Sequence, residues 1–95
     1  MLTEQQLNYM NDKIGNLRYQ LNGNQDSLEL AEKTLEDRIR RYGDALNVNG
    51  GYKREIKVIK DAIKERKAEI ERLAVKLTRY EVALKNNKYI EDIED

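Results

Sequence analysis

The chain has 95 residues, with 18 basic and 18 acidic side chains and a formal net charge of zero. It contains no cysteine, histidine, proline, tryptophan or phenylalanine. The lack of cysteine excludes disulfides and thiolate metal sites, and a charged, proline-free composition favours long helices over a sheet. No apolar run approaches the length of a membrane span or of a signal peptide. We therefore expect one all-α domain over residues 1–95, in the cytoplasm of its own cell or of a host cell.

The first predicted element is a helix over residues 3–46. Seam residues recur at alternate spacings of three and four, which is the a/d heptad pattern of a coiled coil. The pattern keeps its phase through Asn22-Gly23-Asn24, where a loop would have reset it, so we expect one continuous helix, in which Gly23 leaves room for a local kink. The seam positions are Leu7, Met10, Ile14, Leu17, Leu21, Asn24, Leu28, Ala31, Leu35, Arg38 and Tyr42.

A turn is predicted over residues 47–51, because Asn-Gly and Gly-Gly supply the positive φ values of a tight reversal. A second helix over residues 52–90 continues the alternation. Folding the chain about residue 49 matches the two seams, which predicts a long antiparallel coiled-coil helical hairpin. The second seam comprises Tyr52, Ile56, Ile59, Ile63, Arg66, Ile70, Leu73, Leu77, Tyr80, Leu84 and Asn87.

An alternative architecture breaks the first helix at residues 22–26. Gly23 would cap one helix, and Asp26 with Glu29 would form the capping box of the next. The result is a three-helix bundle with helices over residues 3–22, 26–47 and 52–90. The hairpin is favoured, because the bundle leaves the more apolar end of the last helix without a partner.

Two polar residues, Asn24 and Arg66, occupy seam positions. A polar seam residue penalises slipped pairings at some cost in stability, so we interpret both as register controls. Pairing about residue 49 places Arg66 opposite Ala31, with Glu32 as its expected partner.

A second set of apolar residues lies outside the seams. Two helices alone bury little surface, so a second interface is expected, and two hairpins side by side would form a four-helix bundle. Outside the seam of the second helix, Ala68 lies in line with Val75, Val82 and Tyr89 at intervals of seven residues. The predicted oligomer interface comprises Leu2, Tyr9, Leu30, Val75, Val82 and Tyr89.

The residue types point away from catalysis. Without histidine or cysteine the chain lacks the commonest general base, metal ligand and nucleophile, and no glycine-rich phosphate loop is present. Its carboxylates form i,i+4 pairs of a solvated helix face, such as Glu29 with Lys33. We expect no enzymatic activity, no metal, no cofactor and no small-molecule substrate.

Basic residues concentrate in the middle of the chain. Residues 38–60 hold seven basic and two acidic side chains. A basic stripe can track phosphates, although lysines beside a seam can also cover it with their methylene stems. The candidate residues for binding a partner or nucleic acid are Arg38, Arg40, Arg41, Lys53, Arg54, Lys57, Lys60, Lys64 and Lys67.

The sequence therefore predicts a non-enzymatic interaction or adaptor protein, of the kind that serves as a bacterial or phage accessory or inhibitor protein. It would self-associate as a dimer of hairpins and bind a protein partner. The alternative is a nucleic-acid-binding protein that contacts phosphates with its basic residues. No association with a membrane is expected.

Overall fold

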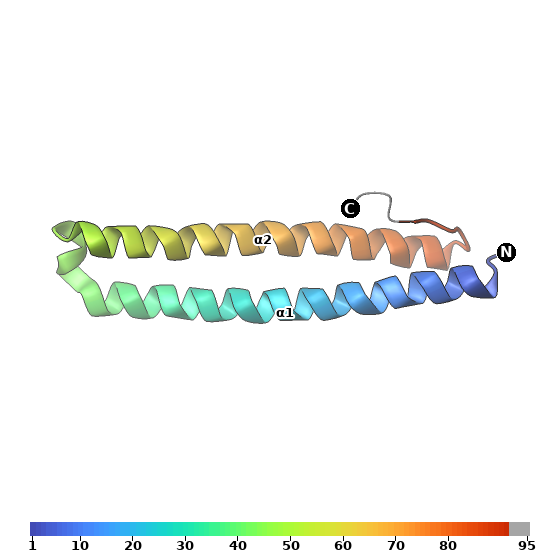
Figure 1. Cartoon of the computed structure of the whole chain (residues 1–95), viewed down its shortest axis with the longest axis horizontal. Helices are drawn as coiled ribbons and strands as arrows, with labels where there is room; N and C mark the ends of the chain where they lie inside the picture. Colours follow the sequence, from blue (N-terminus) through green and yellow to red (C-terminus); the bar gives the residue numbers. More distant parts are fainter. Residues whose placement is uncertain (92–95) are drawn as a thin grey trace. The chain divides into compact units, whose positions relative to one another are not determined.

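The fold is all-helical and confirms the predicted hairpin. The computed structural model describes residues 1–91, in which α1 spans Glu4–Tyr42, the 3₁₀ helix η1 spans Gly43–Asn47 and α2 spans Gly50–Lys85 (Figure 1). No strand occurs in this described part. Because α1 runs unbroken through Gly23, the three-helix alternative is wrong, and Asp26 lies inside a helix instead of capping one.

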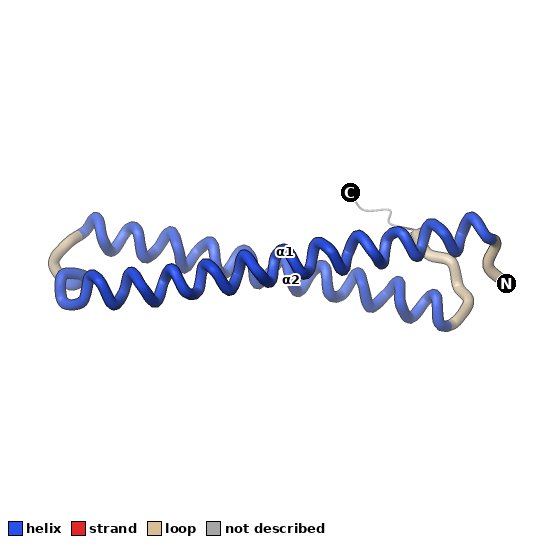
Figure 2. Tube along the Cα trace, turned by 90° about the horizontal axis from the view of Figure 1, so that it is seen from below, coloured by secondary structure: helices blue, strands red, loops and turns tan. Residues whose placement is uncertain are grey.

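The helices contribute to two compact units. Among the described residues, unit 1 contains Met1–Asn22 and residues 71–91, and unit 2 contains Gly23–Ile70. In each unit a segment of α1 lies antiparallel to a segment of α2, and unit 2 also contains the connection between the helices (Figure 2).

The heptad seams are the buried lines of both helices. Every predicted seam position of α1 is buried or half-buried. The same holds for the seam of α2 except at Arg66 and at Asn87, which lies beyond the end of the helix. The alternation of threes and fours therefore identified the packed face correctly, since it keeps one stripe of a helix turned toward its neighbour.

The first turn of α1 is closed by a capping box. The Thr3 amide donates to Gln6 Oε1 at 3.0 Å, and the Gln6 amide donates back to Thr3 Oγ1 at 3.1 Å. This reciprocal pair satisfies two backbone donors that have no partner within the helix. It fixes the start of α1 at Glu4.

The reversal comes earlier in the chain than its predicted position at residues 47–51. Gly43 has a φ of +47° and ends α1, after which η1 carries the chain around. Gly50 and Gly51 belong to α2 instead of the turn, because Asn49 caps that helix by accepting the Tyr52 amide at Oδ1, 3.1 Å away. An asparagine before two glycines serves as a helix N-cap as readily as a turn.

The earlier reversal shifts the pairing of the seams. Tyr52 stacks on Tyr42, with ring centroids 3.9 Å apart. Arg66 donates to Asn24 Oδ1 at 2.8 Å, so its predicted pairing with Glu32 is wrong. The two polar seam residues therefore bind each other, which is the arrangement that a register control requires.

The second helix ends at Lys85, short of the predicted residue 90. The Lys88 amide donates to the Ala83 carbonyl at 2.8 Å, and the Asn87 amide donates to the Leu84 carbonyl at 3.2 Å. With Asn87 at a φ of 55°, these two bonds form a Schellman motif. The chain turns there, and Tyr89 and Ile90 pack against the core of unit 1.

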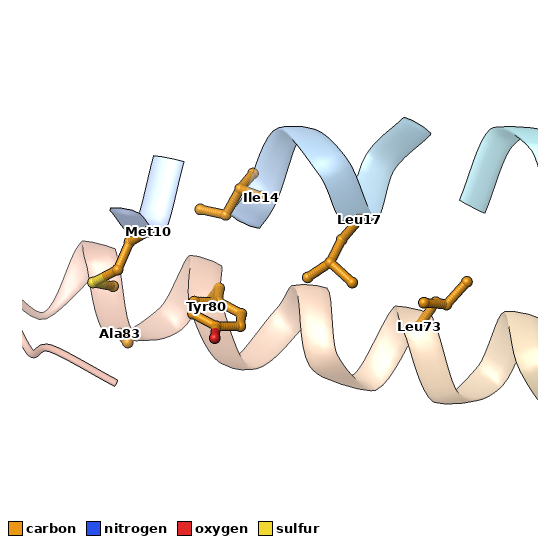
Figure 3. Packing of buried hydrophobic residues seen from close by; sticks show 6 residues of the cluster. All are labelled: Met10, Ile14, Leu17, Leu73, Tyr80 and Ala83. Atoms are coloured by element: carbon orange, nitrogen blue, oxygen red, sulfur yellow. The ribbon is translucent and has the colours of Figure 1, made fainter. Parts of the chain in front are cut away.

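The buried core is concentrated in unit 1. Met10, Ile14 and Leu17 of α1 point toward α2, where they meet the other three members of the cluster (Figure 3). In unit 2, every residue of which is described, only Ile56 and Ile63 are buried to a similar degree. The other members of the unit 1 cluster are Leu73, Tyr80 and Ala83.

Candidate interaction surfaces

All nine basic candidate residues lie in unit 2, where three arginines of α1 form one group, five lysines of α2 form another, and Arg54 belongs to neither. The arginines at the end of α1 bind carboxylates. Arg40 bonds Glu36 at 3.1 Å and Arg41 bonds Asp37 at 3.3 Å, both one helical turn away. Such exposed pairs contribute little stability, yet they balance the charge of these arginines locally.

Arg38 belongs to the packing of unit 2. Its Nε donates to Glu55 Oε1 at 3.0 Å and its Nη1 contacts Asp37 at 3.1 Å. The Tyr42 hydroxyl donates to the other oxygen of the Glu55 carboxylate. The Tyr42 hydrogen bond, followed by the bond and charge of Arg38, lowers the pKa of Glu55 although partial burial opposes this. Arg38 therefore joins α1 to α2 and is poorly placed to receive a ligand.

The five lysines of α2 form the second group. Lys53, Lys57 and Lys60 continue into Lys64 and Lys67 at alternate spacings of four and three, so they follow one side of the helix. None of the five makes an ion pair or side-chain hydrogen bond within residues 1–91. Arg54, near the start of the same helix, turns back to the Gly50 carbonyl at 3.4 Å. The structure thus pairs the three candidate arginines of α1 with carboxylates and leaves the five lysines and Arg54 without a carboxylate partner within residues 1–91.

A hollow of about 350 Å³ lies beside the first three lysines. It is lined by Leu46 of η1 and by four residues of α2, namely Lys53, Ile56, Lys57 and Lys60. We call this hollow the lysine groove. Its two apolar residues form a floor beside three lysines. This combination is typical of a binding surface, whereas a solvated helix face has no apolar floor.

The predicted oligomer interface divides in a similar way. Leu2, Tyr9 and Tyr89 pack against the core of unit 1, where the rings of Tyr9 and Tyr89 lie 5.8 Å apart. Val75 and Val82 are 56% and 50% exposed and lie seven residues apart on α2. Leu30 is 67% exposed but lies in unit 2, so it does not extend the surface of unit 1.

A second hollow, of about 380 Å³, adjoins Val82 in unit 1. Its apolar wall consists of Val82, Ala83 and Ile90. Ile90 lies there because the Schellman motif turns the chain at the end of α2. We call Val75, Val82 and this hollow the outer apolar surface. The remaining lining residues are Thr78, Arg79, Asn86 and Lys88.

Several features of these surfaces were missed by sequence reasoning. Leu46 lies beyond the last predicted seam position of the first helix, and nothing in the heptad pattern indicated that it borders a groove. Tyr19 and Val58 are exposed large side chains outside both predicted surfaces. The ion pair between Arg38 and Glu55 was only weakly indicated by the sequence, in which opposite charges lie on either side of the reversal.

Neither a cluster of metal-ligand side chains nor a membrane-spanning helix occurs within residues 1–91. Among residues 1–91 there is no group of three or more histidine, cysteine, aspartate or glutamate side chains that could hold a metal. Neither helix in this range is apolar enough over a sufficient length to cross a membrane. Comparison of the chain with protein-family models, curated proteins and solved structures gave no match.

Proposed function

We propose that this chain is a non-enzymatic interaction protein that pairs with a second copy through unit 1 and binds a macromolecular partner through unit 2. The outer apolar surface carries the proposal. Val75 and Val82 lie outside the seam, and both are at least half exposed. Apolar residues that recur every seven positions away from a seam are typical of a helix that packs on two sides.

The hollow beside Val82 supports pairing for a second reason. A large apolar side chain from another copy would find Ile90 and Ala83 there, and burial of one such side chain contributes about 1.5–3 kcal/mol. A twofold interface uses the same surface on both copies, so each favourable contact occurs twice.

Sedimentation equilibrium tests the pairing. The unmodified protein is expected to dimerise, and Val82→Lys is expected to be monomeric, because a charge would be buried at the interface. Val58→Lys is the matched control, since Val58 is also exposed on α2 but lies in unit 2. A monomeric unmodified protein, or equal effects of both variants, would refute the proposal.

A second candidate function is nucleic-acid binding along the five unpaired lysines. Their regular spacing on one side of α2 would let several reach successive phosphates. Affinity for a short DNA duplex would then fall steeply with salt, and Lys57→Glu, Lys60→Glu and Lys64→Glu together would abolish it. Absence of DNA and RNA binding at low salt would eliminate this function.

A further inference from the structure

The lysine groove combines two kinds of surface that a single ligand class would match. Lys53, Lys57 and Lys60 supply positive charge along one side, and Leu46 and Ile56 supply the apolar floor. Lys53 and Lys60 are seven residues apart on α2, which is about 10 Å of helix. A ligand that fills the groove must therefore present carboxylates or other anions beside an apolar group over about two helical turns.

The charge of this groove is uncompensated because of how the neighbouring pairs are arranged. Asp61 follows Lys60 directly in sequence but makes no ion pair within the described chain, whereas Glu55 is held by Arg38 and Tyr42. The nearby acidic residues Glu36 and Asp37 pair with arginines of α1. The groove lysines make no such pair within the described chain, so an incoming carboxylate would displace no existing partner.

Unit 2 buries fewer apolar side chains than unit 1, so a segment that covered unit 2 would enlarge its small core. Ile56 and Ile63 are its buried residues, whereas unit 1 has a cluster of six. Leu46 remains half-buried at the edge of the groove. A segment laid over Leu46 would remove more apolar surface from water, which favours binding without any change in the fold.

We propose that the lysine groove is a docking site for an acidic amphipathic helix of a partner protein. The inference rests on the proposed interaction function and specifies the partner that unit 2 would bind. Carboxylates three and four residues apart on the partner helix would face the lysines, and a large apolar side chain between them would contact Leu46.

Two observations favour a helix over a nucleic acid. The rings of Tyr42 and Tyr52 stack on each other with an interplanar angle of 1°. One face of each ring is therefore already covered and cannot stack on a nucleic-acid base. The groove also has an apolar floor beside Lys53, Lys57 and Lys60 but not beside Lys64 and Lys67. A phosphate backbone would use all five lysines alike.

Fluorescence anisotropy with the full chain tests the inference. The probe is a fluorescein-labelled helical peptide of about 14 residues, with leucine at alternate spacings of three and four and glutamate beside each leucine. Saturable binding is expected, and Lys57→Glu with Lys60→Glu should weaken it by about tenfold or more. The matched control, Lys64→Glu with Lys67→Glu, makes the same change in charge on the same helix and should weaken it by about threefold or less.

The apolar contact has its own pair of variants. Leu46→Ser should weaken peptide binding, whereas Leu46→Met should retain it, because methionine preserves the apolar volume. Circular dichroism establishes that each variant remains helical. If Leu46→Ser folds and binds the peptide as tightly as the unmodified chain, the groove is not the docking site.

Failure of the inference differs from failure of the proposed function. Absence of saturable peptide binding, or equal loss in the two lysine pairs, overturns the docking site even where sedimentation shows a dimer. Tighter binding of a DNA duplex that all five lysines support equally also overturns it. If the protein is monomeric but binds the peptide with the expected pattern of losses among the variants, the docking site is upheld. The proposed pairing through unit 1 is then refuted.

Discussion

Gly23 and Gly43 hold opposite backbone conformations, and their replacement by alanine should therefore have opposite effects. Gly23 lies within α1, and a Cβ added there would meet nothing within 4 Å. Gly23→Ala should raise the free energy of unfolding by about 0.5–1 kcal/mol through helix propensity. Gly43 has a φ of +47°, so Gly43→Ala should lower it by about 1–2 kcal/mol.

Urea denaturation of both variants measures this difference. The two substitutions add the same methyl group, so each is the control for the other. A loss of stability at Gly23 would mean that α1 is interrupted there in solution. No loss at Gly43 would mean that the turn does not require a left-handed residue.

Glu55 should make stability depend on pH. Its pKa in the folded chain lies below the usual value, mainly because the Tyr42 hydroxyl donates to the carboxylate and Arg38 reinforces it. The ionised form is thus favoured by folding. Its contribution is complete above the pKa of an unfolded glutamate, about 4.3, and is lost as pH falls through the lower folded value.

Thermal unfolding of the unmodified chain and of Glu55→Gln, compared from pH 7 to pH 3, measures that contribution. The unmodified chain should be the more stable at pH 7, and the gap should narrow below about pH 4.3. A gap that stays constant over this range would show that the carboxylate charge does not stabilise unit 2.

At the scale of the elements, the cap of α2 is the clearest target. Asn49 Oδ1 accepts the Tyr52 amide, and Asn49→Ala should lower the free energy of unfolding by about 1 kcal/mol. Asn47→Ala is the matched control, since Asn47 is an exposed asparagine at the end of η1. Equal effects of the two substitutions would contradict the role of Asn49 as a cap.

The extent of both helices followed from the sequence better than their ends did. Heptad phase is a property of many residues together, so it survived Gly23 and located the seams. A turn or cap depends on one or two residues that suit several conformations. Asn49 and the two glycines after it are compatible both with a turn and with the start of a helix. Because α1 already ends before Gly43, the chain reverses before Asn49, and the two glycines belong to α2.

The candidate sites were predictable as patterns but not as contacts. The lysine spacing on α2 could be recognised directly, because one helix determines it. The neutralisation of Arg38 could not, since it depends on the register that brings Glu55 within 3.0 Å. The same is true of Tyr89 and Ile90, which reach the core only after Asn87 turns the chain.

At the scale of the whole molecule, the two units should differ in local stability. Unit 1 has a cluster of six buried side chains, and unit 2 buries Ile56 and Ile63. Amides with fewer buried apolar contacts around them open more readily. Native-state hydrogen exchange should therefore show faster exchange for α1 and α2 in unit 2 than for the same helices in unit 1.

The comparison uses each amide corrected for its intrinsic exchange rate, so sequence effects do not contribute. Addition of the acidic helical peptide should slow exchange around Ile56 and leave unit 1 unchanged. Uniform protection across both units without the peptide would contradict the inferred difference in core packing.

The stacked pair of Tyr42 and Tyr52 provides the chain with an optical reporter. The sequence has six tyrosines and no tryptophan, so no indole absorption overlaps the near-ultraviolet signals of the tyrosines. Two phenol rings that lie parallel with centroids 3.9 Å apart couple their electronic transitions. The near-ultraviolet circular dichroism of this pair would report on closure of the reversal in unit 2 without any attached label, and Tyr52→Leu would supply the blank spectrum.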